Sequence, residues 1–258
     1  MTEKWCAVYL SGTGNTEYCI KKFTCLLDDA MPIAAIEDKN AIALIKDFEY
    51  IVLGYPIQFS NMPVMVKDFI SANSAVWQGK KVFCIATMGL FSGDGTGCSA
   101  RLLKKYGATI LGGLHLKMPD SICDSKLLKK RREENIKIIE EAEDKIEQAA
   151  SKIKHGKFPH EGLSVFSHIA GLFGQRLWFC GKTKNYSDKL KINSTLCIGC
   201  GTCAKLCPMG NLKIQDNKAA AKQKCTMCYR CISKCPKKAI TLLGKQVVEQ
   251  HRMENYMQ

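Results

Sequence analysis

Short apolar runs alternate with longer amphipathic segments along the first 156 residues of the chain. The apolar runs are nearly continuous, as in strands buried on both faces, and they occupy residues 4–10, 31–37, 50–54, 82–87 and 109–116. The amphipathic segments predict helices at residues 17–27, 63–70 and 96–106. Because strands and helices alternate, we predict an α/β fold with a doubly wound parallel sheet and helices on both of its faces.

A longer helix is predicted from about Ser125 to Lys154, where Ile and Ala recur at spacings of three and four on one face. The next segment, 158–180, is apolar nearly all round and short for a membrane span, so we predict a buried helix. It could lie between domains, form a dimer contact or attach to a membrane surface. We therefore expect a domain at 1–156, an apolar helix and linker at 157–187, a small α+β domain at 188–244 and a tail at 245–258.

The last third of the chain contains a cysteine run that occurs twice. Each copy reads Cys-x2-Cys-x2-Cys-x3-Cys-Pro, with cysteines at Cys197, Cys200, Cys203 and Cys207, and at Cys225, Cys228, Cys231 and Cys235. This spacing matches the run that holds two 4Fe–4S clusters in bacterial ferredoxins, where the fourth cysteine binds the other cluster. We therefore predict one cluster on Cys197, Cys200, Cys203 and Cys235, and a second on Cys225, Cys228, Cys231 and Cys207. The alternative is a pair of structural zinc sites, each held by four cysteines. Such sites usually consist of two Cys-x2-Cys knuckles separated by a longer loop, so the spacing here fits the iron–sulfur clusters better.

A loop rich in hydroxyls and glycine follows the first apolar run. It consists of Ser11, Gly12, Thr13, Gly14, Asn15 and Thr16. Between a strand and a helix, such a turn directs backbone N–H groups at an anion, so we predict a phosphate cradle. It is neither a Walker loop nor a dinucleotide fingerprint. The hexapeptide resembles the phosphate loop of flavodoxins, which bind FMN, while a plain tight turn is the alternative.

Two further loops follow apolar runs at the same predicted edge of the sheet. In flavodoxins the corresponding loops enclose the flavin ring, so the resemblance implies further FMN contacts here. The candidates are Tyr55, Pro56, Ile57, Gln58 and Phe59 in one loop, and Thr87, Met88, Gly89, Leu90, Phe91 and Gly93 in the other. Tyr55 or Phe59 on one side and Phe91 on the other are the aromatic candidates for stacking, with core packing as the alternative for each.

The chain has 15 cysteines and a formal net charge of +14. Seven cysteines lie outside the two runs without pairing spacing, so we expect reduced thiols and a cytoplasmic location. Residues 188–258 carry 13 Lys and Arg against 4 Asp and Glu, a net charge of +9. This excess either steers an acidic redox partner or offsets the charge of the clusters. We expect neither nucleic-acid binding, since no basic stripe with interleaved aromatics is present, nor an integral membrane segment.

Together these motifs resemble the flavodoxin–ferredoxin fusion proteins of anaerobic bacteria, over about residues 1–244. The resemblance implies a flavodoxin-like domain with FMN, followed by a two-cluster ferredoxin domain. One departure is that residues 1–120 are near neutral, with 12 Lys and Arg against 11 Asp and Glu, whereas flavodoxins are typically acidic.

Three functions are consistent with these residues. The first is electron transfer between the two 4Fe–4S clusters and FMN, with a redox protein as partner. The second is an enzyme in which the clusters feed the flavin and the flavin reduces a small organic acceptor. The third is a flavin-free redox scaffold or sensor. No acid–base or nucleophilic constellation is apparent, so no catalytic residue is predicted.

Overall fold

The computed structural model describes residues 4–90, 93–127, 129–164 and 186–256, and these fall into two compact units. The first unit takes its residues from Met1–Ser11, Asn15–Pro119 and Glu133–Cys180. The second takes them from Gly12–Gly14, Asp120–Arg132 and Gly181–Gln258. Two segments from the first half of the chain therefore group with the carboxyl-terminal unit. The boundaries predicted at residues 156, 187 and 244 follow chain order and stay a prediction.

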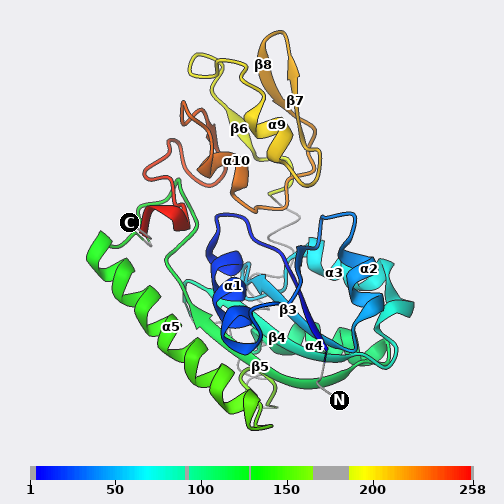
Figure 1. Ribbon diagram of the computed structural model, residues 1–258. Helices are drawn as coiled ribbons and strands as arrows, with labels where there is room; N and C mark the ends of the chain where they lie inside the picture. The colour runs from blue at the N-terminus through cyan, green and yellow to red at the C-terminus, as the bar shows by residue number, and fades with distance from the viewer. Residues whose placement is uncertain (1–3, 91–92, 128, 165–185, 257–258) are drawn as a thin grey trace. The chain divides into compact units, whose positions relative to one another are not determined.

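The first unit is built on a five-stranded sheet in which every neighbouring pair of strands is parallel (Figure 1). The strands are β1 (Trp5–Tyr9), β2 (Ile33–Ala35), β3 (Tyr50–Pro56), β4 (Lys81–Met88) and β5 (Thr109–Lys117). Their order across the sheet is β2-β1-β3-β4-β5, which is the flavodoxin-like order of doubly wound folds. The predicted fold class is confirmed by this topology.

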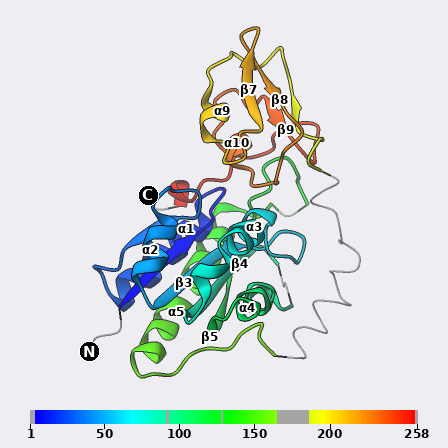
Figure 2. The same cartoon turned by 90° about the vertical axis from the view of Figure 1, so that its right-hand side faces the viewer.

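Helices cover both faces of the sheet (Figures 1 and 2). They are α1 (Asn15–Leu27), α2 (Ala41–Asp47), α3 (Val64–Ala72), α4 (Gly95–Lys105) and α5 (Arg132–Lys154), with a short 3-10 turn η1 (Ser74–Trp77). On one face, Phe23 of α1 stacks on Phe83 of β4 with ring centroids 5.5 Å apart. On the other, alternate strand residues such as Leu53 form a buried core with Ile70 of α3 and Leu103 of α4. The helices predicted at residues 17–27, 63–70 and 96–106 are confirmed, and α2 is an additional one.

The long helix α5 begins at Arg132, whereas the sequence pattern predicted a start near Ser125. The physical reason is charge. Glu133 and Glu134 occupy the first turn, where the positive end of the helix dipole favours acidic side chains. Of the four cations that precede Glu133, Lys129, Lys130 and Arg131 lie outside the helix, and only Arg132 is in its first turn, where the dipole disfavours cations. Residues 120–132 instead pack with the second unit.

Residues 158–164 are not helical, so the helix predicted over 158–180 does not start where expected. Phe158 packs against the sheet, with its ring centroid 6.4 Å from Trp5 and 6.1 Å from Phe83. His160 forms a parallel bridge with Gly113 of β5. Apolar packing and backbone pairing therefore hold this segment in an extended form. Residues 165–180 of the predicted helix lie outside the described residues. In the described ranges, no helix combines the length and apolar character needed to cross a bilayer.

The second unit is small and follows the cysteine repeat. Its elements are β6 (Lys191–Ile192), α9 (Thr202–Leu206), β7 (Leu212–Gln215), β8 (Lys218–Ala221), α10 (Arg230–Ser233), β9 (Ile240–Thr241) and η3 (Met253–Tyr256). The strands pair antiparallel as β6 with β9 and β7 with β8. Each copy of the run thus reads as a cysteine loop, a short helix and a strand, with β7 and β9 in equivalent places.

Candidate functional site

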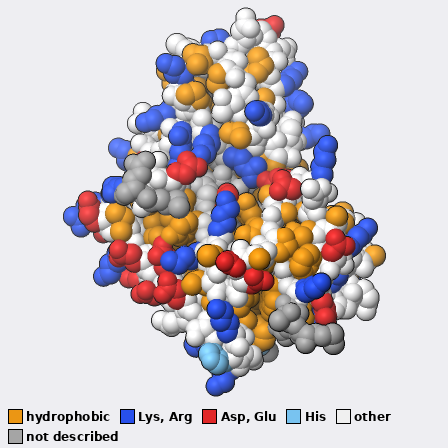
Figure 3. All heavy atoms as spheres, in the orientation of Figure 1, with side chains coloured by type: hydrophobic (Ala, Val, Ile, Leu, Met, Phe, Trp, Pro, Cys, Tyr) orange, Lys and Arg blue, Asp and Glu red, His pale blue; other side chains and the backbone are white. Residues whose placement is uncertain are grey.

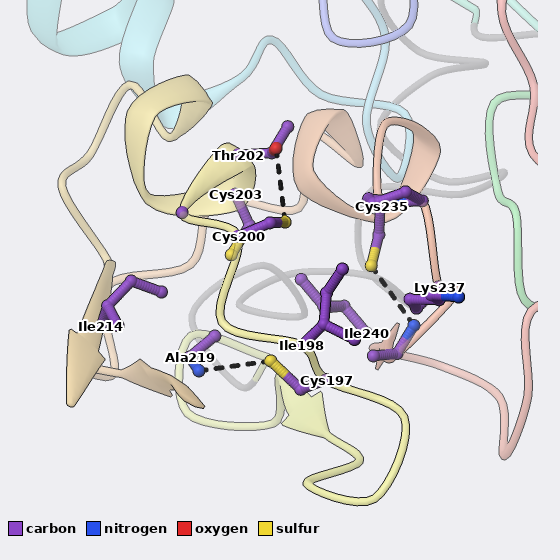
Figure 4. Close-up of a pocket in the computed structure, with 13 residues that line it drawn as sticks. Cys197, Ile198, Cys200, Thr202, Cys203, Ile214, Ala219, Cys235, Lys237 and Ile240 are labelled. Atoms are coloured by element: carbon purple, nitrogen blue, oxygen red, sulfur yellow. Dashed lines mark hydrogen bonds between the residues drawn. The ribbon is translucent and has the colours of Figure 1, made fainter. Parts of the chain in front are cut away.

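The first cavity of the second unit is surrounded by four cysteines from both copies of the run. Cys197, Cys200, Cys203 and Cys235 line it together, and it encloses about 350 Å³ including space open to solvent. In Figure 4 the sulfur atoms lie around this common space. The backbone N–H of Ala219 donates to Cys197 Sγ at 3.4 Å, and that of Ala239 donates to Cys235 Sγ at 3.3 Å.

The second cavity is surrounded by the other four cysteines. Cys207, Cys225, Cys228 and Cys231 line it, and it encloses about 330 Å³ including open space. The N–H of Asn211 donates to Cys207 Sγ at 3.3 Å, just as Ala239 serves Cys235 in the first cavity. The N–H of Met227 donates to Cys225 Sγ at 3.4 Å. Each cavity therefore combines three cysteines of one run with the fourth cysteine of the other.

The donor set fits a cluster of several metal atoms better than a single ion. Within the described ranges, no three His, Cys, Asp or Glu side chains converge closely enough to hold one metal ion. In a 4Fe–4S cluster each cysteine binds a different iron, so the four sulfurs surround the cluster instead of meeting at a point. Backbone N–H groups directed at sulfur also suit thiolate ligands. The ligand assignment itself stays a prediction.

Two equivalent positions of the cysteine loops share a left-handed backbone, but the residues at them differ. Gly199 and Gly201 of the first loop have φ values of 67° and 75°. The equivalent residues of the second loop are Met227 and Tyr229, with φ values of 58° and 61°. This left-handed region is uncommon for residues with a side chain. At Gly199 a glycine is required, because an added Cβ would overlap the backbone of Asn217.

The first cavity has more exposed lining residues than the second. Ile198 and Ile214 line the first cavity and are 57% and 39% exposed, and Cys200 is also exposed. Tyr229 and Leu242 line the second cavity and are only 5% and 4% exposed. Leu242 is the repeat equivalent of Ile214, so the same position changes from exposed to buried between the two copies.

The thiol pKa values reflect this difference in surroundings. Burial raises the pKa of Cys225 to about 11 and also raises that of Cys231. In the first cavity, burial raises the pKa of Cys203. The hydroxyl of Thr202, whose oxygen lies 3.4 Å from Cys200 Sγ, lowers the pKa of the exposed Cys200 thiol, and the backbone N–H of Thr202 adds to this. The pKa of Cys200 is thus lowered by its hydrogen bonds, whereas burial raises those of Cys225 and Cys231 in the second cavity.

Asp124 is a buried carboxylate at the centre of the second unit, 4% exposed. Its Oδ2 accepts the backbone N–H groups of Leu242, Leu243 and Gly244 at 2.5, 2.9 and 3.1 Å. Its Oδ1 accepts the hydroxyl of Tyr229 at 2.9 Å. This residue was not among the predicted ones. No local motif marks it, because its partners are more than 100 positions away in the sequence.

Residues 245–256 are packed into the second unit. The side-chain amide of Gln250 donates to the carbonyls of Ile232 and Cys235 at 2.9 and 2.7 Å. The hydroxyl of Ser233 donates to the carbonyl of His251, which is itself buried. The segment expected as a tail therefore fixes helix α10, which carries Cys231.

The candidate flavin loops of the first unit leave the sheet at the same edge. The N–H of Ile57 donates to the carbonyl of Thr87 at 2.8 Å, which joins the loops after β3 and β4. The hydroxyls of Thr16 and Thr87 lie 2.8 Å apart, and Asn15 Nδ2 donates to the carbonyl of Pro119 at 2.7 Å. Pro56, Gln58, Met88 and Gly89 are half-buried at this edge, and Leu90 is exposed.

Tyr55 is not available to stack on a flavin, which corrects one of the two aromatic candidates in its loop. Its ring is fully buried, and its hydroxyl donates to the carbonyl of Gly95 at 2.8 Å and lies 2.7 Å from Ser99 Oγ. Phe59 remains, and with Ser60 it forms the tip of the loop at φ values of 46° and 58°. Phe91 lies outside the described residues, whereas Gly93 is buried with a φ of 64°.

The middle of the predicted phosphate cradle, Gly12–Gly14, groups with the second unit, whereas Ser11, Asn15 and Thr16 belong to the first. An added Cβ at Gly12 would overlap the carbonyl oxygen of Cys228. Thr13 Oγ1 lies 2.8 Å from Ser121 Oγ. Close packing accounts for Gly12, a role the local sequence pattern did not suggest.

Comparison with known proteins supports the iron–sulfur assignment. Residues 189–252 match the family model described as a 4Fe-4S dicluster domain. The putative electron transport protein YsaA of Escherichia coli is 30% identical over 69 residues, 24% of this chain and 44% of the relative. A ferredoxin of Pyrobaculum islandicum is 32% identical over 64 residues, 24% of this chain and 60% of the relative. The chain thus spans less than two thirds of each of these relatives.

Solved flavodoxins resemble the other part of the chain. The Megasphaera elsdenii flavodoxin is 24% identical to this chain, and the match has a TM-score of 0.42. It covers 57% of this chain and 98% of the flavodoxin chain. The Fusobacterium nucleatum flavodoxin bound to flavin mononucleotide is 17% identical to this chain, with a TM-score of 0.43. The match covers 59% of this chain and 98% of that flavodoxin chain. The flavodoxin-like assignment itself rests on the strand order of the sheet. The dicluster match supports a redox role for residues 189–252.

Proposed function

We propose that the chain is an electron-transfer protein that holds two 4Fe–4S clusters and FMN. The observation that carries this proposal is the cross-pairing of the two cysteine runs. Each cavity collects Cys-x2-Cys-x2-Cys from one run and the Cys-Pro cysteine from the other. The clusters supply transfer of one electron at a time, and the flavin supplies storage of one or two.

The chain's own residues hold, orient and cover these groups. Helices α9 and α10 each carry the third cysteine of a loop, Cys203 and Cys231. The backbone N–H groups of Asn211 and Ala239 fix the two crossing cysteines. The proposal assigns Ser11–Thr16 to the flavin phosphate and the loops after β3 and β4 of the first unit to the ring. The exposed Leu90 and the strained turn at Phe59 support this, since strain of this kind occurs at ligand sites.

The partner we propose is an acidic redox protein that meets the first cavity. Exposed Leu196, Ile198 and Ile214 form an apolar edge around this cavity, and Lys237 lines it. Lys and Arg side chains are spread over this unit with few acidic ones between them (Figure 3). Asp216, in the turn after β7, is one of the four acidic residues of 188–258. A basic rim around an apolar centre favours an acidic partner through electrostatic steering.

The proposal is tested by purifying the full chain without oxygen and measuring iron, sulfide, zinc and flavin per chain. We expect about eight irons, about eight sulfides and one FMN. Zinc in place of iron, or only half the iron after full reconstitution, contradicts two clusters. Iron and sulfide at full occupancy without flavin would leave the clusters in place and overturn the FMN part alone.

A further inference from the structure

The two cavities differ in the charged side chains that line them or are hydrogen-bonded to their lining residues. Lys237 lines the first cavity, and Lys218 Nζ donates to the carbonyl of the ligand candidate Cys197 at 2.5 Å. The lining of the second cavity, as far as residues are described, has no charged side chain, and Arg230 beside it in sequence is not part of the lining. The Asp124 carboxylate, however, is hydrogen-bonded to two of the lining residues, Tyr229 and Leu242.

The negative charge of Asp124 is held in place and not cancelled by its partners. All four donors, three backbone N–H groups and the Tyr229 hydroxyl, are neutral. The carboxylate is almost completely buried, so water screens it little. The hydroxyl of Tyr229 and the backbone N–H of Leu242 both bond to this carboxylate. Tyr229 and Leu242 line the second cavity, so each of them separates the charge from the cavity by a single residue. A fixed charge at such a site acts strongly on any change of charge inside the cavity.

We propose that Asp124 makes the second cavity the lower-potential iron–sulfur site of the two. The inference rests on the proposed function, because it requires a cluster in each cavity. Reduction of either site adds one electron from an external reductant and makes that site more negative, while no bond forms or breaks. In the second cavity the Asp124 carboxylate repels the added electron, and burial removes the water that would solvate it. In the first, Lys218, Lys237 and solvent stabilise it.

The consequence is a direction for electrons within the second unit. A single electron resides mainly at the first cavity, where Cys200 is exposed. The covered second cavity holds the more strongly reducing electron. Asp124 acts as a positioning residue for charge, since it touches neither cavity itself and reaches the second through Tyr229 and Leu242.

The test is Asp124→Asn in the full chain, loaded with clusters anaerobically. Asn keeps the shape, accepts the same backbone N–H groups and donates to the Tyr229 oxygen, but removes the charge. Asp120→Asn is the matched control: it removes an equal charge from the same segment, and its Oδ1 accepts the N–H of Ile122 instead of a lining residue. Each protein is titrated with dithionite and the two couples are followed by electron paramagnetic resonance. Cys200→Ala, which retains only the second cluster, identifies the couples.

We expect Asp124→Asn to raise the reduction potential of the lower couple by about 59 mV, which is a tenfold change in the one-electron reduction equilibrium. The potential of the upper couple should stay the same. Asp120→Asn should move the lower couple by less than a third of that shift. An unchanged lower couple in Asp124→Asn protein overturns the inference. So does a Cys200→Ala protein whose remaining couple is the higher one, a result that stands even if Asp124→Asn fails to keep its cluster. Absence of clusters from the wild-type protein instead rejects the proposed function.

Discussion

The two copies of the cysteine run share a backbone and differ in what surrounds it. Gly201 and exposed Ile214 in the first copy correspond to buried Tyr229 and Leu242 in the second. The first cavity is lined by Lys237 and by exposed isoleucines, and the second by the ring of Tyr229, whose hydroxyl donates to the Asp124 carboxylate behind it. The comparison teaches that cysteine spacing determines which sulfurs meet, whereas the residues between them determine access and charge.

The cysteine ligands should have the largest effect on this comparison. Cys200→Ala and Cys228→Ala each remove one predicted ligand, one per cavity, so each should lose about four of eight irons. Iron and sulfide analysis after anaerobic loading measures this. Cys25→Ala is the matched control, because Cys25 is an exposed thiol outside both cavities, and it should lose none. A variant of either ligand that keeps all its iron contradicts the assignment.

Tyr229→Gly should remove much of the difference in access, because it gives the second loop the residue that the first has at Gly201. Loss of the buried ring should cost about 3 kcal/mol, after the relief that glycine brings at a positive φ. The second cluster should then bleach in oxygen about as fast as the first, and the loss of cluster absorbance measures both rates. Tyr229→Phe keeps the ring and should bleach slowly. Equal rates in Tyr229→Phe and Tyr229→Gly proteins would show that the ring does not provide the cover.

Ile198→Glu tests whether the exposed cavity is the docking side. A carboxylate on the apolar edge should slow electron transfer to an acidic redox protein severalfold, because it repels the partner. Stopped-flow mixing at low and high salt measures this, and the wild-type rate should fall as salt rises. Leu127→Glu adds the same charge at another exposed apolar residue of the second unit and should have a smaller effect. Equal slowing by both variants would contradict docking at the first cavity.

His251 should give the smallest effect, a pH dependence of the segment that fixes α10. Burial lowers the pKa of His251 to about 4, so the folded chain holds this ring neutral. The unfolded chain binds a proton near pH 6.5, so stability is complete above that pH and is lost as pH falls toward 4. We expect a loss of about 2 kcal/mol between pH 7 and pH 5.

The urea midpoint of cluster bleaching, measured at both pH values, checks this. His251→Gln protein should lose less stability over the same pH interval. Acid sensitivity of the clusters affects both proteins equally, so it cancels when the two losses of stability are subtracted. An identical decline in both proteins would rule out the histidine as its source.

The sheet was predictable because burial on both faces leaves a local signal. The runs that became β1, β3, β4 and β5 are continuous apolar stretches, and the alternation with helices predicted their parallel order. The start of α5 was predictable in principle, since Glu133 and Glu134 follow four cations, but the apolar stripe alone extended the helix too far.

The surroundings of the cavities were not predictable, because they depend on contacts between distant segments. Asp124 meets Leu242 across more than 100 residues, and Gly12 is packed against Cys228. Neither contact has a local pattern. The role of Tyr55 was not predictable for the same reason. An aromatic residue at the end of a strand can belong to a ligand loop or to the core, and only the packing of distant segments shows that Tyr55 is buried in the core.

The most direct test of the account is the crossing of the fourth cysteines. Cys235→Ala and Cys200→Ala proteins are loaded anaerobically, and the potential and resonance spectrum of the surviving cluster are compared with those of Cys207→Ala and Cys228→Ala proteins. We predict that Cys235→Ala matches Cys200→Ala and that Cys207→Ala matches Cys228→Ala. A match of Cys235→Ala with Cys228→Ala would contradict the two cross-paired sites on which the proposed function depends.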